Sequence, residues 1–183
     1  MVKVITPPVK EPVSLDEFKQ WANGLPVTAE QESIVNVMLK AGREEAEAYQ
    51  NVAYCEQTLQ LTVGREERWH SDAPLTVTLP RPPFRELKSV TAILPDGTEE
   101  DVTEQFEVRN DGGLAMLVLK TDGDMPDFWR LQIVYTAGYD TVPDKVKQAI
   151  LLYATWAWMH RGGDEPIPAA FYALLGKGRV IPV

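Results

Sequence analysis

The sequence predicts an α+β protein in which helices from the N- and C-terminal parts of the chain form a bundle and a mostly antiparallel β region of about six strands is inserted between them. Two observations lead to this class. Apolar residues recur at helical spacing before residue 51 and after residue 142, whereas they alternate with polar residues between about 56 and 136. Short turns separate the strand-like runs, and such turns favour antiparallel neighbours over βαβ units.

The composition is that of a globular protein with an acidic excess. Of 183 residues, 44% are apolar and 25% are charged, so we expect a buried core in a single domain, residues 1–183. The 27 acidic residues outnumber the 18 Lys and Arg, and the net charge is −9. Because gripping phosphates requires cations, this balance argues against a dominant DNA-binding role. The sequence shows no signal peptide and no apolar run long enough for a bilayer, so we expect a cytosolic origin and no membrane contact.

The first third of the chain predicts an extended lead-in and two helices. Prolines in residues 1–13 exclude a helix there. Ser14 and Glu17 form a capping-box pattern that predicts a short helix, and Thr28 with Gln31 predicts the start of a second helix that ends near residue 50. Its apolar positions are Ile34, Val37, Met38, Ala41, Ala48 and Tyr49, and its other face is acidic, with Glu44, Glu45 and Glu47.

The middle of the chain changes to a period of two. Leu59, Leu61 and Val63 alternate with polar residues, and the same alternation returns at 75–79. Further strand-like runs occur at 87–94, 105–108, 114–119 and 128–136. The dipeptide at 96–97 is Asp-Gly, which predicts a tight hairpin.

The last part predicts helices at about 143–161 and 168–175, followed by an extended tail at 177–183. Between 146 and 159 only Lys147, Gln148 and Thr155 are clearly polar, so most of the helix surface must find apolar neighbours. Two interpretations stay open. The helix is central within its own subunit, or a third face packs against a neighbouring copy with Trp156, Trp158 and Met159 among the anchors.

Residues that commonly carry catalysis lie in no recognisable motif. The two histidines, His70 and His160, have no nucleophile pattern around them, and His160 is interpreted as a favourable residue beside a helix C-terminus. Cys55 is the only cysteine, which excludes an internal disulfide, and we expect a half-buried, inert thiol.

Acidic residues leave one alternative open. Asp122, Asp124 and Asp127 fail the spacing of a calcium loop, and we interpret them as a solvated turn between strands. We therefore predict no catalytic residue, no metal and no cofactor. Since 27 acids allow many pairs, a carboxylate-dependent hydrolase or a small-ligand-binding α+β module remains the alternative function.

Several segments, in this order, are similar to the tailed-phage head-tail connector proteins, also called head-completion or adaptor proteins. The similarity runs along nearly the whole chain. The segments are VITPP at 4–8, PVSLDE at 12–17, AGREEAE at 41–47, QTLQL at 57–61, LPRPPF at 79–84, VTAI at 90–93, VYTAGY at 134–139 and VPDKVKQAI at 142–150.

This resemblance implies a structural role without catalysis. Such proteins form a ring in the virion neck, usually dodecameric, that docks under the portal protein, extends the DNA channel and presents a platform to a stopper or tail-completion protein. Isolated copies are often monomeric. DNA passes through without sequence-specific binding.

The resemblance also directs attention to three groups of residues. Trp156, Trp158 and Met159 are expected at a subunit or portal interface. The tail, with Arg179, Val180, Ile181 and Val183, is expected either to pair with the portal or a neighbour, or to be a frayed terminus. Negative charge toward a lumen would let DNA slide, so Glu44, Glu45 and Glu47 are candidates for a channel-facing or ring-facing surface, the alternative being a solvated helix face.

Overall fold

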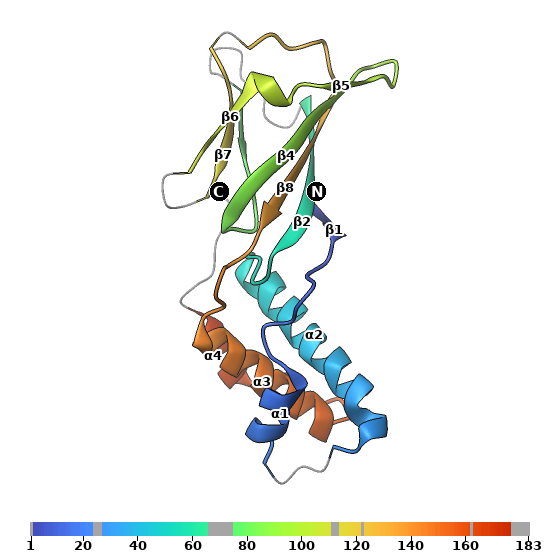
Figure 1. Ribbon diagram of the computed structural model, residues 1–183, viewed down its shortest axis with the longest axis vertical. Helices are drawn as coiled ribbons and strands as arrows, with labels where there is room; N and C mark the ends of the chain where they lie inside the picture. Colours follow the sequence, from blue (N-terminus) through green and yellow to red (C-terminus); the bar gives the residue numbers. More distant parts are fainter. Residues whose placement is uncertain are drawn as a thin grey trace. The chain divides into compact units, whose positions relative to one another are not determined.

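The computed structural model describes residues 2–23, 27–65, 75–110, 114–121, 123–161 and 163–176. The chain divides into two compact units (Figure 1). The β unit comprises Met1–Pro8 and Glu56–Gly138, and the helical unit comprises Val9–Cys55 and Tyr139–Val183. The predicted α+β class is confirmed, with helices from both ends of the chain in one unit and antiparallel strands in the other.

The β unit contains two antiparallel sheets. The five-stranded sheet has the order β1-β2-β8-β4-β5, and the three-stranded sheet has the order β3-β7-β6. The strands are β1 Val2–Thr6, β2 Gln57–Gly64, β3 Thr76–Thr78, β4 Phe84–Ile93, β5 Glu99–Asp101, β6 Phe106–Arg109, β7 Met116–Leu119 and β8 Arg130–Ala137.

The alternation in sequence places one face of each central strand in the core. Leu59, Leu61 and Val63 of β2 are buried, and Leu61 lies opposite Ile133 of β8. The Tyr135 hydroxyl, also from β8, donates to the Pro80 carbonyl at 2.6 Å. The predicted strands are therefore confirmed at these positions.

A hairpin and an N-terminal strand of the β unit relate directly to the sequence predictions. The predicted hairpin at residues 96–97 joins β4 to β5, and Gly97 has a φ of 88°, which favours glycine. The N-terminal lead-in is more ordered than predicted, because Val2–Thr6 pairs with β2 and Val4 lies opposite Leu59. An extended segment satisfies its backbone groups by adding to an open sheet edge.

The helical unit contains α1 Leu15–Trp21, α2 Glu32–Gln50, α3 Asp144–Met159 and α4 Ala169–Leu175. The predicted capping box is confirmed: Glu17 N donates to Ser14 Oγ at 3.2 Å, and Ser14 N donates to Glu17 Oε2 at 2.7 Å. Thr28 N donates to the Gln31 side chain at 3.1 Å, at the start of a 3₁₀ turn that leads into α2.

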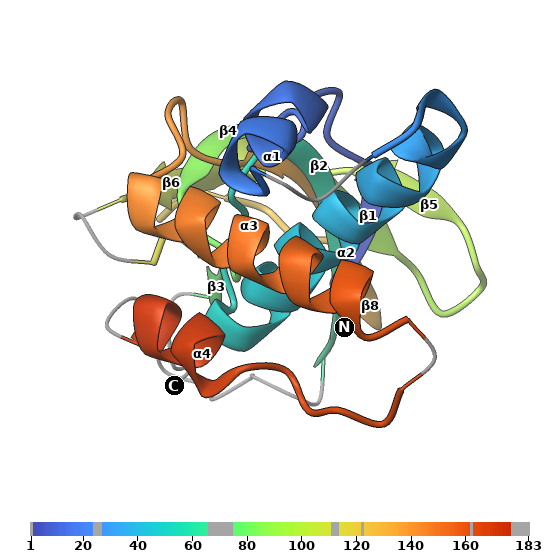
Figure 2. The ribbon, with the colours of Figure 1, turned by 90° about the horizontal axis from the view of Figure 1, so that it is seen from below.

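The core of the helical unit lies between α2 and α3, and α1 and α4 lie on opposite sides of α3 (Figure 2). Phe18, Leu39, Ile150 and Phe171 are among its buried residues. Gly42 permits a close approach of the two long helices, since a Cβ at this position would lie 3.0 Å from Tyr153 Cδ1. Among the described residues, no helix is long and apolar enough to cross a bilayer.

Candidate functional site

The buried face of α2 agrees only in part with the apolar positions predicted from sequence, of which Met38 and Tyr49 pack against the core. Ile34 is 42% exposed and Val37 is 66% exposed, whereas the core takes Val35, Leu39 and Ala46. The remaining buried residues of α2 are Gly42, Arg43, Glu47 and Gln50. The helix has two faces that carry apolar residues. The face that contains Arg43 and Glu47 has fewer of them, but it is buried because its polar groups find hydrogen-bond partners inside the unit.

A buried ionic cluster explains how charged residues reach this core. The Arg43 guanidinium donates through Nε to Glu11 Oε2 at 2.7 Å and through Nη1 to Glu47 Oε2 at 2.6 Å. Glu47 Oε1 also accepts from the Tyr54 backbone N–H at 2.8 Å. Burial opposes the charged guanidinium, but the carboxylates outweigh this effect and raise the pKa of Arg43. The cluster ties the lead-in and the loop after α2 to the helix.

The three acidic residues predicted to face a channel have different surroundings. Glu47 is 4% exposed and belongs to the ionic cluster, so its assignment to an exposed channel-facing surface is wrong. Glu44 is exposed, and its carboxylate lies 3.5 Å from Arg43 Nη2, at the edge of the ionic cluster, and 3.9 Å from Lys40 Nζ. Glu45 is partly buried and accepts from the Tyr172 hydroxyl at 3.3 Å. A channel-facing role for Glu44 and Glu45 stays a prediction.

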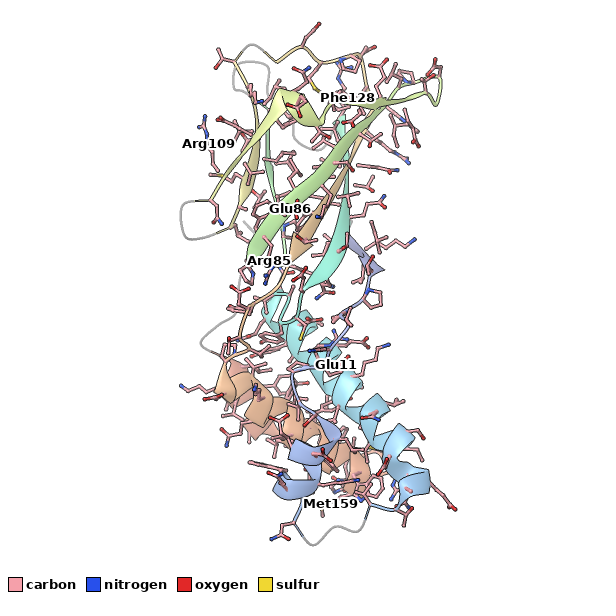
Figure 3. The ribbon with its side chains drawn as sticks, in the orientation of Figure 1. Glu11, Arg85, Glu86, Arg109, Phe128 and Met159 are labelled. Atoms are coloured by element: carbon pink, nitrogen blue, oxygen red, sulfur yellow. The ribbon has the colours of Figure 1, made fainter. Side chains whose placement is uncertain are left out.

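The three interface candidates of α3 also differ in their exposure. Trp158 is 7% exposed, belongs to the core cluster, and lies beneath the Arg161 guanidinium at 4.0 Å. Met159, labelled in Figure 3, is 63% exposed. Trp156 is partly buried beside Tyr153, and its Nε1 is buried without a hydrogen-bond partner among the described residues. Met159 is thus the accessible member of the three, and the interface assignment stays a prediction.

The remaining face of α3 carries polar and apolar residues together. Asp144, Lys145 and Gln148 are exposed, and Leu152 and Thr155 are partly buried. Neighbours within the helical unit therefore cover only part of this helix. Ala149, Ile150 and Ala154 lie in the core, as expected for a helix that is central within its own subunit, and packing of another face against a neighbouring copy stays a prediction.

The described residues that were considered for catalysis or metal binding take part in a helix cap, a buried position, an ion pair and a hydrogen bond. His160 is the C-cap of α3, and its Nδ1 lies 2.9 Å from the Trp156 carbonyl. Cys55 is buried, and burial raises the pKa of its thiol to about 11. Asp127 pairs with Arg65, and Asp124 N donates to the Gln105 side chain at 3.1 Å. The described residues hold no cluster of three metal-ligating side chains.

Some of the candidates lie outside the described residues. These are His70, Asp122 and the tail residues Arg179, Val180, Ile181 and Val183.

A groove of about 320 Å³ lies between the lead-in and α2. Its polar side chains include Lys10, Glu11 and Asn36, and its floor includes Val13 and Leu39. The Glu11 carboxylate is engaged by Arg43, so it is held as an ion-pair partner. The ion pair between Glu11 and Arg43 therefore holds the lead-in against α2 beside this groove.

Comparison with known proteins places this fold in a group of particle structures. No protein-family model and no curated protein matches the sequence. A chain in the neck of an empty gene transfer agent (GTA) particle, computed with C6 symmetry, matches with a TM-score of 0.78 at 19% identity. A chain in the virion of the native GTA particle matches at 0.76 and 19%, and one in the neck of the native GTA particle, computed with C12 symmetry, matches at 0.76 and 20%. Each match covers 100% of this chain and 97% of the other.

The chain has the fold of these neck and virion proteins. The likeness extends over both units, so the helices and the β insertion belong to one shared architecture. The fold implied by the resemblance to head-tail connectors agrees with this finding.

Proposed function

We propose that this chain is a structural subunit of a virion neck, a head-tail connector that assembles as a ring under the portal protein. The observation that supports the proposal is the full-length likeness to chains of GTA necks whose maps were computed with C6 and C12 symmetry. In such a ring both units act as one subunit, the particle's DNA passes through the channel, and a stopper or tail-completion protein docks beneath.

The charge of the chain suits this role. A channel component must not hold DNA, and a net charge of −9 provides no general attraction for phosphates. Of the candidate side chains that the structure describes, His160 caps a helix, the Cys55 thiol is buried, and Glu47 and Asp127 form ion pairs. We therefore propose a role without catalysis.

Removal and return of the chain tests this function. In a strain that produces the particle, deletion of the gene is expected to leave heads that package DNA but carry no tails, because the platform for the tail is missing. A plasmid copy is expected to restore tailed particles. Tailed, infectious particles without the chain would contradict the proposal.

Binding to the portal provides an independent test. A purified portal ring is expected to retain the chain during sedimentation, with a copy number equal to that of the portal subunits. Native mass spectrometry measures this ratio. The chain remaining entirely in the unbound fraction at saturating concentration would contradict portal docking.

A further inference from the structure

The exposed face of α2 has a heptad pattern. Ile34, Ala41 and Ala48 are seven residues apart, and Val37 and Glu44 lie between them on the same side of the helix. We call these five residues the α2 seam. The seam points away from the buried residues of α2, and its two large apolar members are exposed. A stripe of this kind is typical of a helix that packs against another helix.

The outward side of α3 has the same spacing. Lys145, Leu152 and Met159 are seven residues apart, with Gln148 and Thr155 between them. Lys145, Gln148 and Met159 are exposed, whereas Leu152 and Thr155 are partly buried. We call these five residues the α3 seam. It lies opposite the buried side of α3, which carries Val146, Ile150 and Ala154.

The two seams lie on the sides of α2 and α3 that face away from the buried residues of each helix. Since α2 and α3 pack against each other through a shared core, we place the two seams on different flanks of the bundle. A head-to-tail ring requires two different patches on opposite flanks of each subunit, because every copy uses one patch toward each neighbour.

The direction of the helices defines how the seams would meet. Within one chain α2 and α3 run antiparallel (Figure 1). Neighbours in a twelve-fold ring differ by a rotation of about 30°, so α2 of one copy and α3 of the next keep a nearly antiparallel orientation.

One antiparallel register matches the two seams along their length. It places Ile34 opposite Met159, Ala41 opposite Leu152, and Ala48 opposite Lys145. Large side chains then face small or similar ones, as close helix packing requires. In the same register Lys145 lies one helical turn from Glu44, so the charges at this end are complementary.

We infer that the α2 seam of one copy packs antiparallel against the α3 seam of the next copy, and that this helix pair is the subunit contact of the ring. The inference rests on the proposed function for the existence of a ring, and it assigns the contact to a second copy of this chain. Met159 contributes to it as an interface residue, and Glu44 contributes as a partner of Lys145.

Paired cysteines test the contact. In a Cys55→Ala background, the double variant Ile34→Cys/Met159→Cys is treated with a short bismaleimide, both as purified chain at high concentration and in assembled particles. A ladder of covalent oligomers is expected. An equal mixture of the two single variants is expected to stop at dimers that contain one copy of each.

The controls separate this contact from other arrangements. Gln20→Cys/Ala173→Cys places two exposed cysteines on α1 and α4, away from the seams, and is expected to give no ladder. Crosslinking of Ile34→Cys with itself would indicate a symmetric dimer and would overturn the inference. Particles that contain the chain but give no ladder from the Ile34→Cys/Met159→Cys variant would also overturn it.

Charge exchange provides a second readout in folded protein. Glu44→Lys and Lys145→Glu are each expected to lower the crosslink yield of the Ile34/Met159 pair by about two- to fivefold, and the combined exchange is expected to restore it. Equal yields in all four proteins would overturn the charge contact.

Presence of the chain in particles tests the proposed function, and formation of the crosslinked ladder tests the subunit contact. Absence of the chain from particles, together with a ladder from the purified protein, would contradict the neck location and leave the contact standing. Presence of the chain in particles without a ladder would support the neck location and overturn the subunit contact. Absence from particles and absence of a ladder in the purified protein would overturn both.

Discussion

The Arg43 guanidinium and the Glu47 carboxylate, one turn apart on α2, are both buried and meet at 2.6 Å. Their pairing, with Glu11 on the other side of the guanidinium, turns a polar face of the helix into part of the core. The apolar residues Ile34 and Val37 are consequently left on the surface. The same ion pair thus shapes both the interior of the helical unit and the face that we assign to assembly.

Removing Arg43 is expected to destabilise the chain strongly. Arg43→Leu leaves the Glu47 carboxylate buried without its cation, which costs about 3–5 kcal/mol. Urea unfolding followed by circular dichroism measures the change. Lys40→Leu is the matched control, because its pair with Glu44 is exposed and at 3.9 Å, and the expected change is about 0.5 kcal/mol or less. Similar values for the two variants would contradict a structural role for the cluster.

The capping box predicts a stability change with acid. Hydrogen bonds from the Ser14 backbone and side chain lower the pKa of Glu17 from its ordinary value of 4.5. The folded state therefore binds fewer protons at Glu17 than the unfolded state, so the contribution is complete above pH 4.5 and is lost as the pH falls through the lower folded-state pKa.

Ser14→Ala is expected to cost about 1 kcal/mol at pH 7 and to reduce that acid-dependent loss. Thermal unfolding at pH 7 and pH 3 measures both effects. An unchanged pH dependence would argue against the Ser14–Glu17 pair as its source.

Cys55 is expected to be unreactive while the chain is folded. With the pKa of its thiol at about 11 in place of the ordinary 9.0, the thiolate fraction at pH 8 falls by on the order of 100-fold, and burial also blocks the reagent. Labelling with a thiol-specific chromogenic disulfide should be slow in buffer and fast in denaturant. Val37→Cys in a Cys55→Ala background supplies an exposed control that should react at once. Rapid labelling of Cys55 in native protein would contradict its burial.

The close approach of α2 and α3 depends on Gly42. A larger side chain would collide with Tyr153, so Gly42→Leu is expected to cost about 1–3 kcal/mol of unfolding free energy despite the better helix propensity of leucine. Ala48→Leu, on the exposed side of the same helix, is expected to change stability by about 0.5 kcal/mol or less. Chemical denaturation of both variants compares them. A neutral Gly42→Leu would mean that the two helices separate easily.

Glu44 has two competing roles that one experiment distinguishes. If Glu44 and Glu45 face the channel, Glu44→Lys/Glu45→Lys should slow genome ejection while rings assemble normally, since DNA would adhere to the lumen. If Glu44 lies at the subunit contact, the same change should lower the number of copies per particle, and Lys145→Glu should restore it in part. Quantitative mass spectrometry of particles and a DNA-release assay report the two quantities. We expect the second result.

Sequence patterns predicted the parts of the fold that depend on local chemistry. The capping boxes, the Asp96-Gly97 hairpin and the alternation along β2 each depend on neighbouring residues and appear where they were expected. The strand formed by Val2–Thr6 was missed, because pairing with β2 joins residues more than fifty positions apart. Periodicity also identified α2 but indicated its buried face only in part, since Met38 and Tyr49 pack against the core whereas Ile34 and Val37 are exposed.

By itself, the sequence determined the α+β class and the approximate positions of the helices and of most strands, because periodicity, capping residues and turn residues act over a few positions. Only the tertiary structure decided which side of α2 is interior. The hydrogen bond that Arg43 donates to Glu11 and the one that the Tyr54 backbone N–H donates to Glu47 make burial of Arg43 and Glu47 favourable, and Ile34 and Val37 stay exposed. The tertiary structure likewise decided that Trp158 packs inside while Met159 stays exposed. A side chain's surroundings depend on residues far away in the chain, and no local pattern contains them.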